Sequence, residues 1–263
     1  MKDQLGRHIN LKNTPQRIIS LVPSQTELLF DLGLEKSIVG VTKFCVHPSE
    51  ALKTKTIVGG TKDVKYDRIK ALQPDIILCN KEENTKEIVE TLSEIAPVHV
   101  SDIFDLQDAL ELIQQYGSIF SVEEKATVLV NEILVARDNF QASVKNKTGK
   151  KVAYFIWRKP WMVAGKNTFI DFLLKENKFE NVIENKRYPV ITLSDLQKIP
   201  DLDFIFLSSE PYPFQQKHIE EIQSELPSVK IILVDGEYFS WYGSRLKYAY
   251  TYFTELQLEN GLK

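Results

Sequence analysis

The sequence lacks long apolar stretches. Its longest unbroken hydrophobic run is residues 152–157, six residues, whereas a membrane-spanning helix needs about 20. The composition therefore excludes a transmembrane helix. Residues 1–8 (MKDQLGRH) contain none of the apolar character of a signal peptide, so the chain as given is expected to carry no secretory leader.

Cysteine is nearly absent, since Cys45 and Cys79 are the only two in the chain. Two cysteines cannot form a disulfide scaffold or a four-cysteine zinc site. We expect two reduced, partly buried thiols. A Cys45–Cys79 disulfide is the alternative if the protein meets an oxidising compartment.

Charge of one sign is also lacking, because 33 Lys and Arg residues face 36 Asp and Glu residues, a net charge of −3. Without a basic block, neither nucleic acid nor an anionic membrane is expected as the main partner.

Catalytic motifs are missing as well. No glycine-rich dinucleotide motif or nucleophile elbow occurs, and Gly165-Lys166-Asn167 lacks the rest of a phosphate loop. The four histidines are scattered, which argues against a histidine metal cage. An α/β enzyme is therefore the less favoured hypothesis, and no metal or cofactor is expected.

What the sequence does contain is an alternation of strands and helices over 263 residues. Short apolar runs predict strands, and amphipathic stretches between them predict helices. Ser24 or Thr26 is expected to cap the first helix, after a strand that ends at Pro23. The predicted strands are residues 17–22, 38–42, 56–58, 75–79, 98–100, 152–157, 203–207 and 231–234. This alternation indicates an α/β fold with mostly parallel sheets.

The alternation stops between residues 105 and 146, where no strand is predicted. Apolar residues spaced by three or four, after a capping box at Ser121 and Glu124, predict one long helix over 121–146. A helix–Pro–Asp–strand–Glu pattern at 68–83 recurs at 195–210. We therefore expect two Rossmann-like lobes, 1–104 and 148–263, joined by a backbone helix within 105–147.

Ligands of open α/β sheets bind beyond the carboxyl ends of the strands. In this sequence those ends are rich in aromatic residues, and all three tryptophans fall there. A concave aromatic surface with a few polar groups suits a bulky ligand. His47 falls in the same region, where a lone histidine is more typical of a hydrogen-bonding group than of a metal ligand.

Seven segments at these strand ends resemble one known family, in the same order along the chain. They are 17–29 (RIISLVPSQTELL), 39–48 (VGVTKFCVHP), 58–63 (VGGTKD), 72–77 (LQPDII), 209–214 (SEPYPF), 235–237 (DGE) and 241–245 (WYGSR). The family is the helical-backbone substrate-binding proteins of ABC importers, of the cobalamin and ferric-siderophore type. The resemblance is greatest to members like the cobalamin-binding protein.

The resemblance implies a two-lobed protein that captures cobalamin, a ferric siderophore or a haem-like chelate in a cleft between its lobes. It would deliver this ligand to a membrane permease and catalyse nothing. Phe44 falls where the cobalamin-binding member has a ring-stacking tyrosine. The expected ligand residues are Pro23, Ser24, Gln25, Phe44, Cys45, His47, Thr61, Lys62, Trp157, Trp161, Tyr212, Trp241, Tyr242 and Arg245.

Family members often dock to permease arginines through one surface glutamate in each lobe. The candidates here are Glu82, Glu83 and Glu87 in the first lobe and Glu210 and Glu221 in the second.

The resemblance places the protein in the periplasm or on a membrane anchor outside the cytoplasm, if a leader has been removed. The alternative is a leaderless, cytoplasmic corrinoid- or metal-chelate-binding protein of the same fold. Corrin, porphyrin and catecholate ligands fit the expected cleft equally well.

Overall fold

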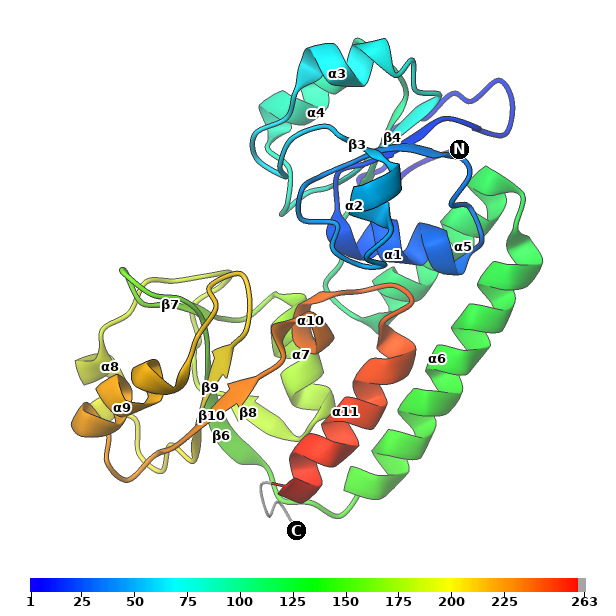
Figure 1. The fold of residues 1–263 in the computed structure, drawn as a ribbon. Coiled ribbons are helices and arrows are strands. Elements are labelled where there is room, and N and C mark those ends of the chain that lie inside the picture. The colour runs from blue at the N-terminus through cyan, green and yellow to red at the C-terminus, as the bar shows by residue number, and fades with distance from the viewer. Residues whose placement is uncertain (260–263) are drawn as a thin grey trace. The chain divides into compact units, whose positions relative to one another are not determined.

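The computed structural model describes residues 1–259, which form two compact units (Figure 1). Unit 1 consists of residues 1–135 and 241–247. Unit 2 consists of residues 136–240 and 248–259. Residues 241–247 thus belong to unit 1, although they come late in the chain. The expected lobes, 1–104 and 148–263, were consecutive ranges and did not include this segment in the first lobe.

Unit 1 is built on a parallel sheet of five strands in the order β3-β2-β1-β4-β5. Side chains of β1, β4 and β5 are buried throughout, as expected when helices cover both faces of a parallel sheet. The strands are β1 (Ile18–Ser20), β2 (Ile38–Val41), β3 (Thr56–Ile57), β4 (Ile76–Asn80) and β5 (Val98–Ser101). The predicted parallel α/β architecture is confirmed here.

The helices that lie wholly in unit 1 are α1 (Pro23–Asp31), α2 (Ala51–Thr54), α3 (Tyr66–Ala71), α4 (Lys86–Ser93) and α5 (Leu106–Phe120). The predicted cap of α1 is wrong. Val22 occupies the N-cap, Pro23 begins the helix, and Ser24 and Thr26 are buried inside it. Proline is favoured there because its fixed φ suits a first turn that has no partner for the missing N–H.

The segment expected to form one backbone helix contains two helices, α5 and α6 (Glu123–Val144). Asp105 and Asp108 form a capping box that begins α5. Ser121 ends α5 in the left-handed conformation, with φ 56°, so its predicted role as the N-cap of the long helix is wrong. Helix α6 has 22 residues, about 33 Å at 1.5 Å per residue, and the division between the units falls within it, after Val135.

Unit 2 contains a mixed sheet of five strands, in which β10-β9-β6-β7 form a path and β8 pairs with β6. The strands are β6 (Lys150–Trp157), β7 (Met162–Ala164), β8 (Phe179–Asn181), β9 (Phe204–Ser208) and β10 (Lys230–Val234). Strand β7 runs antiparallel to the second half of β6, and β8 runs parallel to its first half. Both are three-residue strands that the alternation of longer apolar runs did not reveal.

The helices of unit 2, besides the end of α6, are α7 (Phe169–Glu176), α8 (Leu193–Gln197), α9 (Gln216–Glu225), α10 (Gly236–Ser240) and most of α11 (Leu246–Glu259). The core between sheet and helices includes Phe155, Leu207 and Ile222, none of which is exposed to solvent. Among residues 1–259, no helix is both long and apolar enough to cross a membrane.

Candidate functional site

The carboxyl edge of the unit 1 sheet is a set of loops tied to one another. The backbone N–H of Lys43 donates to the carbonyl of Gly59 over 2.8 Å, joining the loops after β2 and β3. The side chains of Asn84 and Lys62 join the loops after β3 and β4, donating over 2.8 Å to the carbonyls of Thr61 and Glu82 respectively. These bonds make the edge a stable platform for exposed side chains.

Phe44 is the most conspicuous of those side chains, because 49% of it is exposed. The Lys43 ammonium lies 5.0 Å from the centre of its ring, a cation–π contact. Val46 beside it is 41% exposed. A Cβ at Gly60 would lie 3.1 Å from the Phe44 ring, so the glycine leaves room for that ring.

Residues 241–247 reach this edge through Trp241. The Trp241 ring meets the His47 ring edge to face, with centroids 5.5 Å apart. The same indole ring also contacts Arg245, whose guanidinium lies 4.8 Å from the ring centre. Arg245 in turn makes two hydrogen bonds, of 2.9 and 2.7 Å, to the carboxylate of Glu27 in α1. Burial raises the pKa of Glu27, and the Arg245 guanidinium opposes that rise.

Gln25 is fully buried at the centre of a hydrogen-bond network. Its Nε2 lies 2.7 Å from Ser101 Oγ and 3.2 Å from the Tyr242 hydroxyl, and its Oε1 accepts from the Tyr116 hydroxyl over 2.6 Å. Burial raises the pKa of both tyrosines well above their usual range. Gln25 and Tyr242, both expected at the ligand, are therefore buried residues whose hydrogen bonds stabilise the loops of this edge.

Cys45, another of the residues expected at the ligand, is also buried. Its Sγ lies 3.1 Å from Thr26 Oγ1 and 3.3 Å from Thr42 Oγ1. Cys45 and Cys79 are both free, buried thiols. Burial raises the pKa of Cys45 in spite of the two threonine hydroxyls, and it raises the pKa of Cys79 to about 12.

The carboxyl edge of the unit 2 sheet carries its own aromatic cluster. Trp157, at the end of β6, is 40% exposed and meets Tyr212 edge to face with centroids 5.6 Å apart. Trp161 is half-buried and stacks on Phe214 with centroids 6.3 Å apart and planes 10° apart. Tyr212 and Phe214 follow β9, and Trp161 precedes β7, so three segments supply the cluster.

Polar side chains hold this cluster in place. Arg158 lies 5.5 Å from the Trp161 ring centre and makes two hydrogen bonds of 2.8 Å to the Glu221 carboxylate. His218 Nδ1 accepts from the backbone N–H of Gln215 over 2.9 Å, which leaves the proton of a neutral imidazole on Nε2, 3.2 Å from the Tyr212 hydroxyl. Burial and the nearby cations lower the pKa of His218, in agreement with a neutral ring.

The five candidate docking glutamates lie in different surroundings. Glu87 is exposed in the first turn of α4, where hydrogen bonds from its own N–H and from Thr85 lower its pKa. Glu82 and Glu83 are half-buried, and burial raises the pKa of Glu83. Glu210 accepts from the Ser240 hydroxyl over 2.6 Å, and Glu221 is paired with Arg158.

Of the remaining predicted ligand residues, Lys62 is exposed, Pro23 and Thr61 are half-buried, and Ser24 is buried. Glu27, Arg158 and Phe214 lie in strand-end segments that the sequence identified, but none of them was among the expected ligand residues. Tyr116 and Ser101 were not expected at these edges. Their partners lie far away along the chain, and only the fold brings them together.

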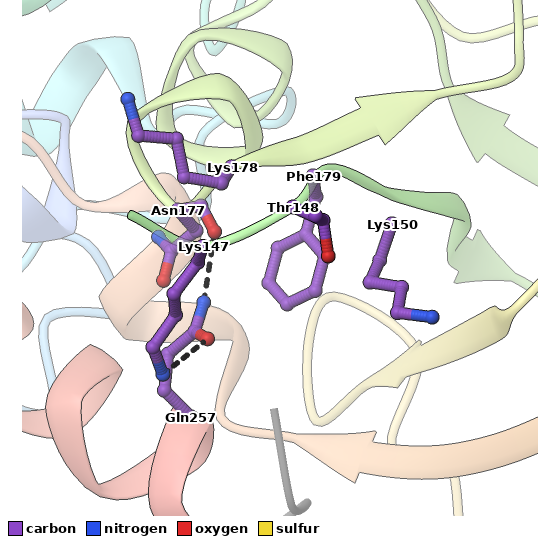
Figure 2. A pocket seen from close by; sticks show the side chains of 7 residues that line it. All are labelled: Lys147, Thr148, Lys150, Asn177, Lys178, Phe179 and Gln257. Atoms are coloured by element: carbon purple, nitrogen blue, oxygen red, sulfur yellow. Dashed lines mark hydrogen bonds between the residues drawn. The ribbon is translucent and has the colours of Figure 1, made fainter. Parts of the chain in front are cut away.

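One polar cavity of unit 2, away from these edges, is too small for a bulky ligand. Figure 2 shows the side chains that line this cavity, among them Lys147, Asn177, Phe179 and Gln257. Its volume is about 20 Å³. A volume near 20 Å³ holds little more than one water molecule. The Gln257 amide accepts from Lys147 and donates to the Asn177 carbonyl, so this cavity is part of the packing of α11.

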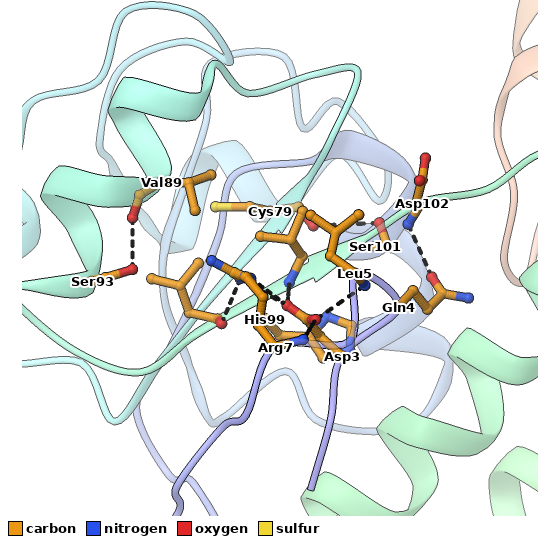
Figure 3. A network of polar contacts seen from close by, with 12 residues as sticks. Asp3, Gln4, Leu5, Arg7, Cys79, Val89, Ser93, His99, Ser101 and Asp102 are labelled. Atoms are coloured by element: carbon orange, nitrogen blue, oxygen red, sulfur yellow. Dashed lines mark hydrogen bonds and ion pairs between the residues drawn. The ribbon is translucent and has the colours of Figure 1, made fainter.

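Figure 3 shows a second network, where the N-terminal segment of unit 1 lies along β5. Asp3, only 4% exposed, accepts from the backbone N–H groups of Leu5, Arg7 and Val100 and pairs with the Arg7 guanidinium. A buried carboxylate satisfied in this way stabilises a fold. Among the described residues, no group of three or more His, Cys, Asp or Glu side chains could hold a metal ion.

Solved structures with the same fold are binding proteins. One is the periplasmic vitamin B12 binding protein BtuF of Vibrio cholerae, with a TM-score of 0.77, 18% identity, and coverage of 94% of this chain and 98% of that chain. Another is a periplasmic heme binding protein from Pseudomonas aeruginosa, with a TM-score of 0.78, 20% identity, and coverage of 92% of each chain. The chain thus shares the fold of these two proteins.

A family model described as "Periplasmic binding protein" matches residues 18–230, and the chain belongs to this family. It is 30% identical to a vitamin B12-binding protein of Vibrio parahaemolyticus over 199 residues, 72% of this chain and 70% of the relative. It is 26% identical over 180 residues to an ABC transporter substrate-binding lipoprotein of Bacillus subtilis, of which the match covers 57%. The resemblance seen in the sequence is confirmed, and these relatives are binding proteins of transporters rather than enzymes.

Proposed function

We propose that this protein is the substrate-binding component of an ABC importer, and that it captures cobalamin or a ferric-siderophore or haem-like chelate for delivery to a permease. The observation that carries the proposal is the exposed Phe44 ring on a hydrogen-bonded platform at the carboxyl edge of a parallel sheet. An exposed aromatic ring held in one orientation favours a large, flat ligand, because stacking then costs little conformational entropy.

The ligand contacts proposed for unit 1 are those with accessible side chains. Phe44 supplies the stacking face, and His47, Thr61 and Lys62 supply polar groups around it. Trp241 and Arg245 support His47, while Gln25, Cys45 and Tyr242 stabilise the loops beneath. For unit 2 we propose that Trp157, Trp161 and Tyr212 form the corresponding aromatic contact surface.

Delivery requires a surface that a permease can recognise. Among the glutamates of unit 1, Glu87 is the best candidate because it is exposed and its lowered pKa keeps it ionised. In unit 2 we propose Glu210, which follows the end of β9 at the carboxyl edge of the sheet. A permease partner of this kind places the protein outside the cytoplasm, as the names of the relatives support.

Titration with cyanocobalamin, haem and a panel of ferric siderophores tests the proposal. Tryptophan fluorescence, corrected for ligand absorption with free N-acetyltryptophanamide, should show saturable quenching by at least one ligand. Trp157 is the main expected reporter because it is the exposed tryptophan, so Trp157→Phe should reduce the quenching amplitude. The absence of a saturable response to every ligand would contradict the proposal.

A further inference from the structure

The chain passes between the two units three times, and two of these crossings flank residues 241–247. The first crossing is inside helix α6, after Val135. The others fall after Ser240 and after Lys247, so the segment 241–247 belongs to unit 1 although the chain on both sides of it belongs to unit 2. The crossing after Lys247 lies inside α11, whereas the crossing after Ser240 coincides with the end of α10. The contacts of residues 241–247 therefore hold the loop after α10 and the first residues of α11 on unit 1.

The strongest of these contacts is the pair of hydrogen bonds between Arg245 and Glu27. The Nε–Oε2 and Nη2–Oε1 distances are 2.9 and 2.7 Å, the geometry of a bidentate arginine–carboxylate pair. Only 10% of the arginine side chain and 17% of the glutamate side chain is exposed. A pair this well shielded from water interacts more strongly than the usual surface ion pair.

The same guanidinium also orients Trp241. It lies 4.8 Å from the centre of the indole ring, and that ring meets His47 at 5.5 Å on the platform that carries Phe44. Gly243 lies between Trp241 and Arg245 in the sequence and has a φ of 103°, which favours glycine. The chain turns there in close contact with Leu28 of α1. Glu27, Arg245, Trp241 and His47 thus form a continuous row of contacts from α1 to the exposed edge.

We propose that Glu27 and Arg245 are positioning residues, which hold the 241–247 segment on α1 and thereby fix Trp241 and His47 in the orientation that the ligand meets. This proposal rests on the proposed function for its ligand step. Glu27 itself touches no ligand in this account. Its loss should loosen the segment and weaken ligand retention, while Phe44 and its platform remain in place.

The test compares Glu27→Gln and Arg245→Lys with a matched control, Glu176→Gln. Arg137 and Glu176 form an equivalent bidentate pair in unit 2, with distances of 2.7 and 3.1 Å. Arg245→Lys keeps the charge but loses the planar fork, and so avoids leaving a buried arginine unpaired. Two readouts need no ligand: amide hydrogen exchange of residues 241–247 and the ring-current shift of the His47 protons over Trp241.

Both site variants should lose exchange protection in 241–247 and move the His47 shifts toward free-imidazole values, and Glu176→Gln should do neither. For any ligand of the panel that binds, the dissociation constant should rise about tenfold in the site variants, the effect expected when the segment is correctly oriented only about a tenth of the time. Unchanged exchange and His47 shifts in both site variants would overturn the positioning role, whatever the panel shows. A panel without any binder would overturn the proposed function, and with it the ligand step, while the exchange and shift measurements still decide the role of the pair.

Discussion

The hydroxyl of Tyr116 in α5 donates a hydrogen bond of 2.6 Å to Oε1 of Gln25 in α1, and neither residue is exposed to solvent. Through the same amide, Gln25 reaches Ser101 at the end of β5 and Tyr242 in the returning segment. A single buried glutamine thus joins two helices, a strand end and a loop of unit 1.

Removing one partner from this network should therefore lower the free energy of unfolding. Tyr116→Phe leaves Oε1 of Gln25 buried with no donor from that side, and we expect a loss of about 1–3 kcal/mol in the free energy of unfolding. Urea denaturation monitored by circular dichroism measures it. Tyr248→Phe is the matched control, because Tyr248 is 56% exposed; its change should stay within about 0.5 kcal/mol. Equal stability of the two variants would show that the Gln25 network contributes nothing.

The pKa of His218 in unit 2 depends on the charges of Arg158 and Glu221, and NMR can measure this dependence. Burial is the largest cause of the lowered pKa of His218, and the Glu221 carboxylate opposes that lowering. Glu221→Gln should therefore lower the pKa of His218 further. Titration of the His218 ring protons in the two proteins measures this shift. An unchanged or higher pKa in the variant would contradict the arrangement. The same spectra should show the neutral ring with its proton on Nε2.

The buried thiols should be nearly inert in the native protein. Burial raises the pKa of Cys79 to about 12 and raises that of Cys45 as well, so at pH 8 neither forms the reactive thiolate. Native protein should react with a disulfide reagent such as DTNB only as fast as it unfolds, and protein in 6 M urea should react at both thiols at once. Fast reaction of one thiol under native conditions would contradict its burial.

Because folding raises the pKa of these thiols, the stability of the protein should also depend on pH in the alkaline range. The pKa of Cys79 is raised from a reference value of 9.0 to about 12 by folding. Its contribution to stability is fully present below pH 9 and is lost as the pH rises through 12.

His99 should make the fold more sensitive to acid. Its Nε2 donates over 2.8 Å to Gln115 Oε1, and that amide is oriented by its own bond to Glu111. The other ring nitrogen, Nδ1, is buried with no hydrogen-bond partner within residues 1–259. Burial therefore lowers the pKa of His99, because a second ring proton would have no acceptor.

A lowered histidine pKa contributes stability that is present above the unfolded value, near 6.5, and is lost as the pH falls through the folded value. Between pH 7 and 5 the wild type should lose stability more steeply than His99→Gln, by at most about 1.4 kcal/mol per pH unit. Urea midpoints measured across this range provide the comparison. The exposed His8, changed to Gln, should leave the wild-type slope unaltered; an identical slope in His99→Gln would refute the prediction.

The elements that the sequence predicted best are those with four or more consecutive apolar residues, such as β4 and β9, because a strand buried on both faces is apolar along most of its length. Strands β7 and β8 were not predicted, since a glutamate interrupts the apolar residues of β8 and the pairing of both strands with β6 depends on the tertiary fold. The break at Ser121 depends on a left-handed backbone conformation, which a serine seldom adopts and which the residue type therefore does not signal.

The site was predictable at the level of segments but not of individual roles. The rule for strand ends identified the loops that hold Phe44 and Trp157, and both side chains are exposed there. It could not separate these from Gln25 and Cys45, which share the same loops but point into the core. That difference depends on partners such as Tyr116 and Thr42, whose positions follow from packing.

The central claim is that an aromatic surface built around Phe44 captures a bulky chelate. The most direct measurement is calorimetric titration of the ligand panel into the wild type, Phe44→Ala and a control variant, Val128→Ala, which removes an apolar side chain that is 57% exposed on α6. We predict that at least one ligand binds the wild type and the control with equal affinity, and that Phe44→Ala weakens its binding about tenfold or more, the loss expected of a stacking aromatic. Failure of the whole panel to bind, or equal affinity of Phe44→Ala and the wild type, would contradict the claim.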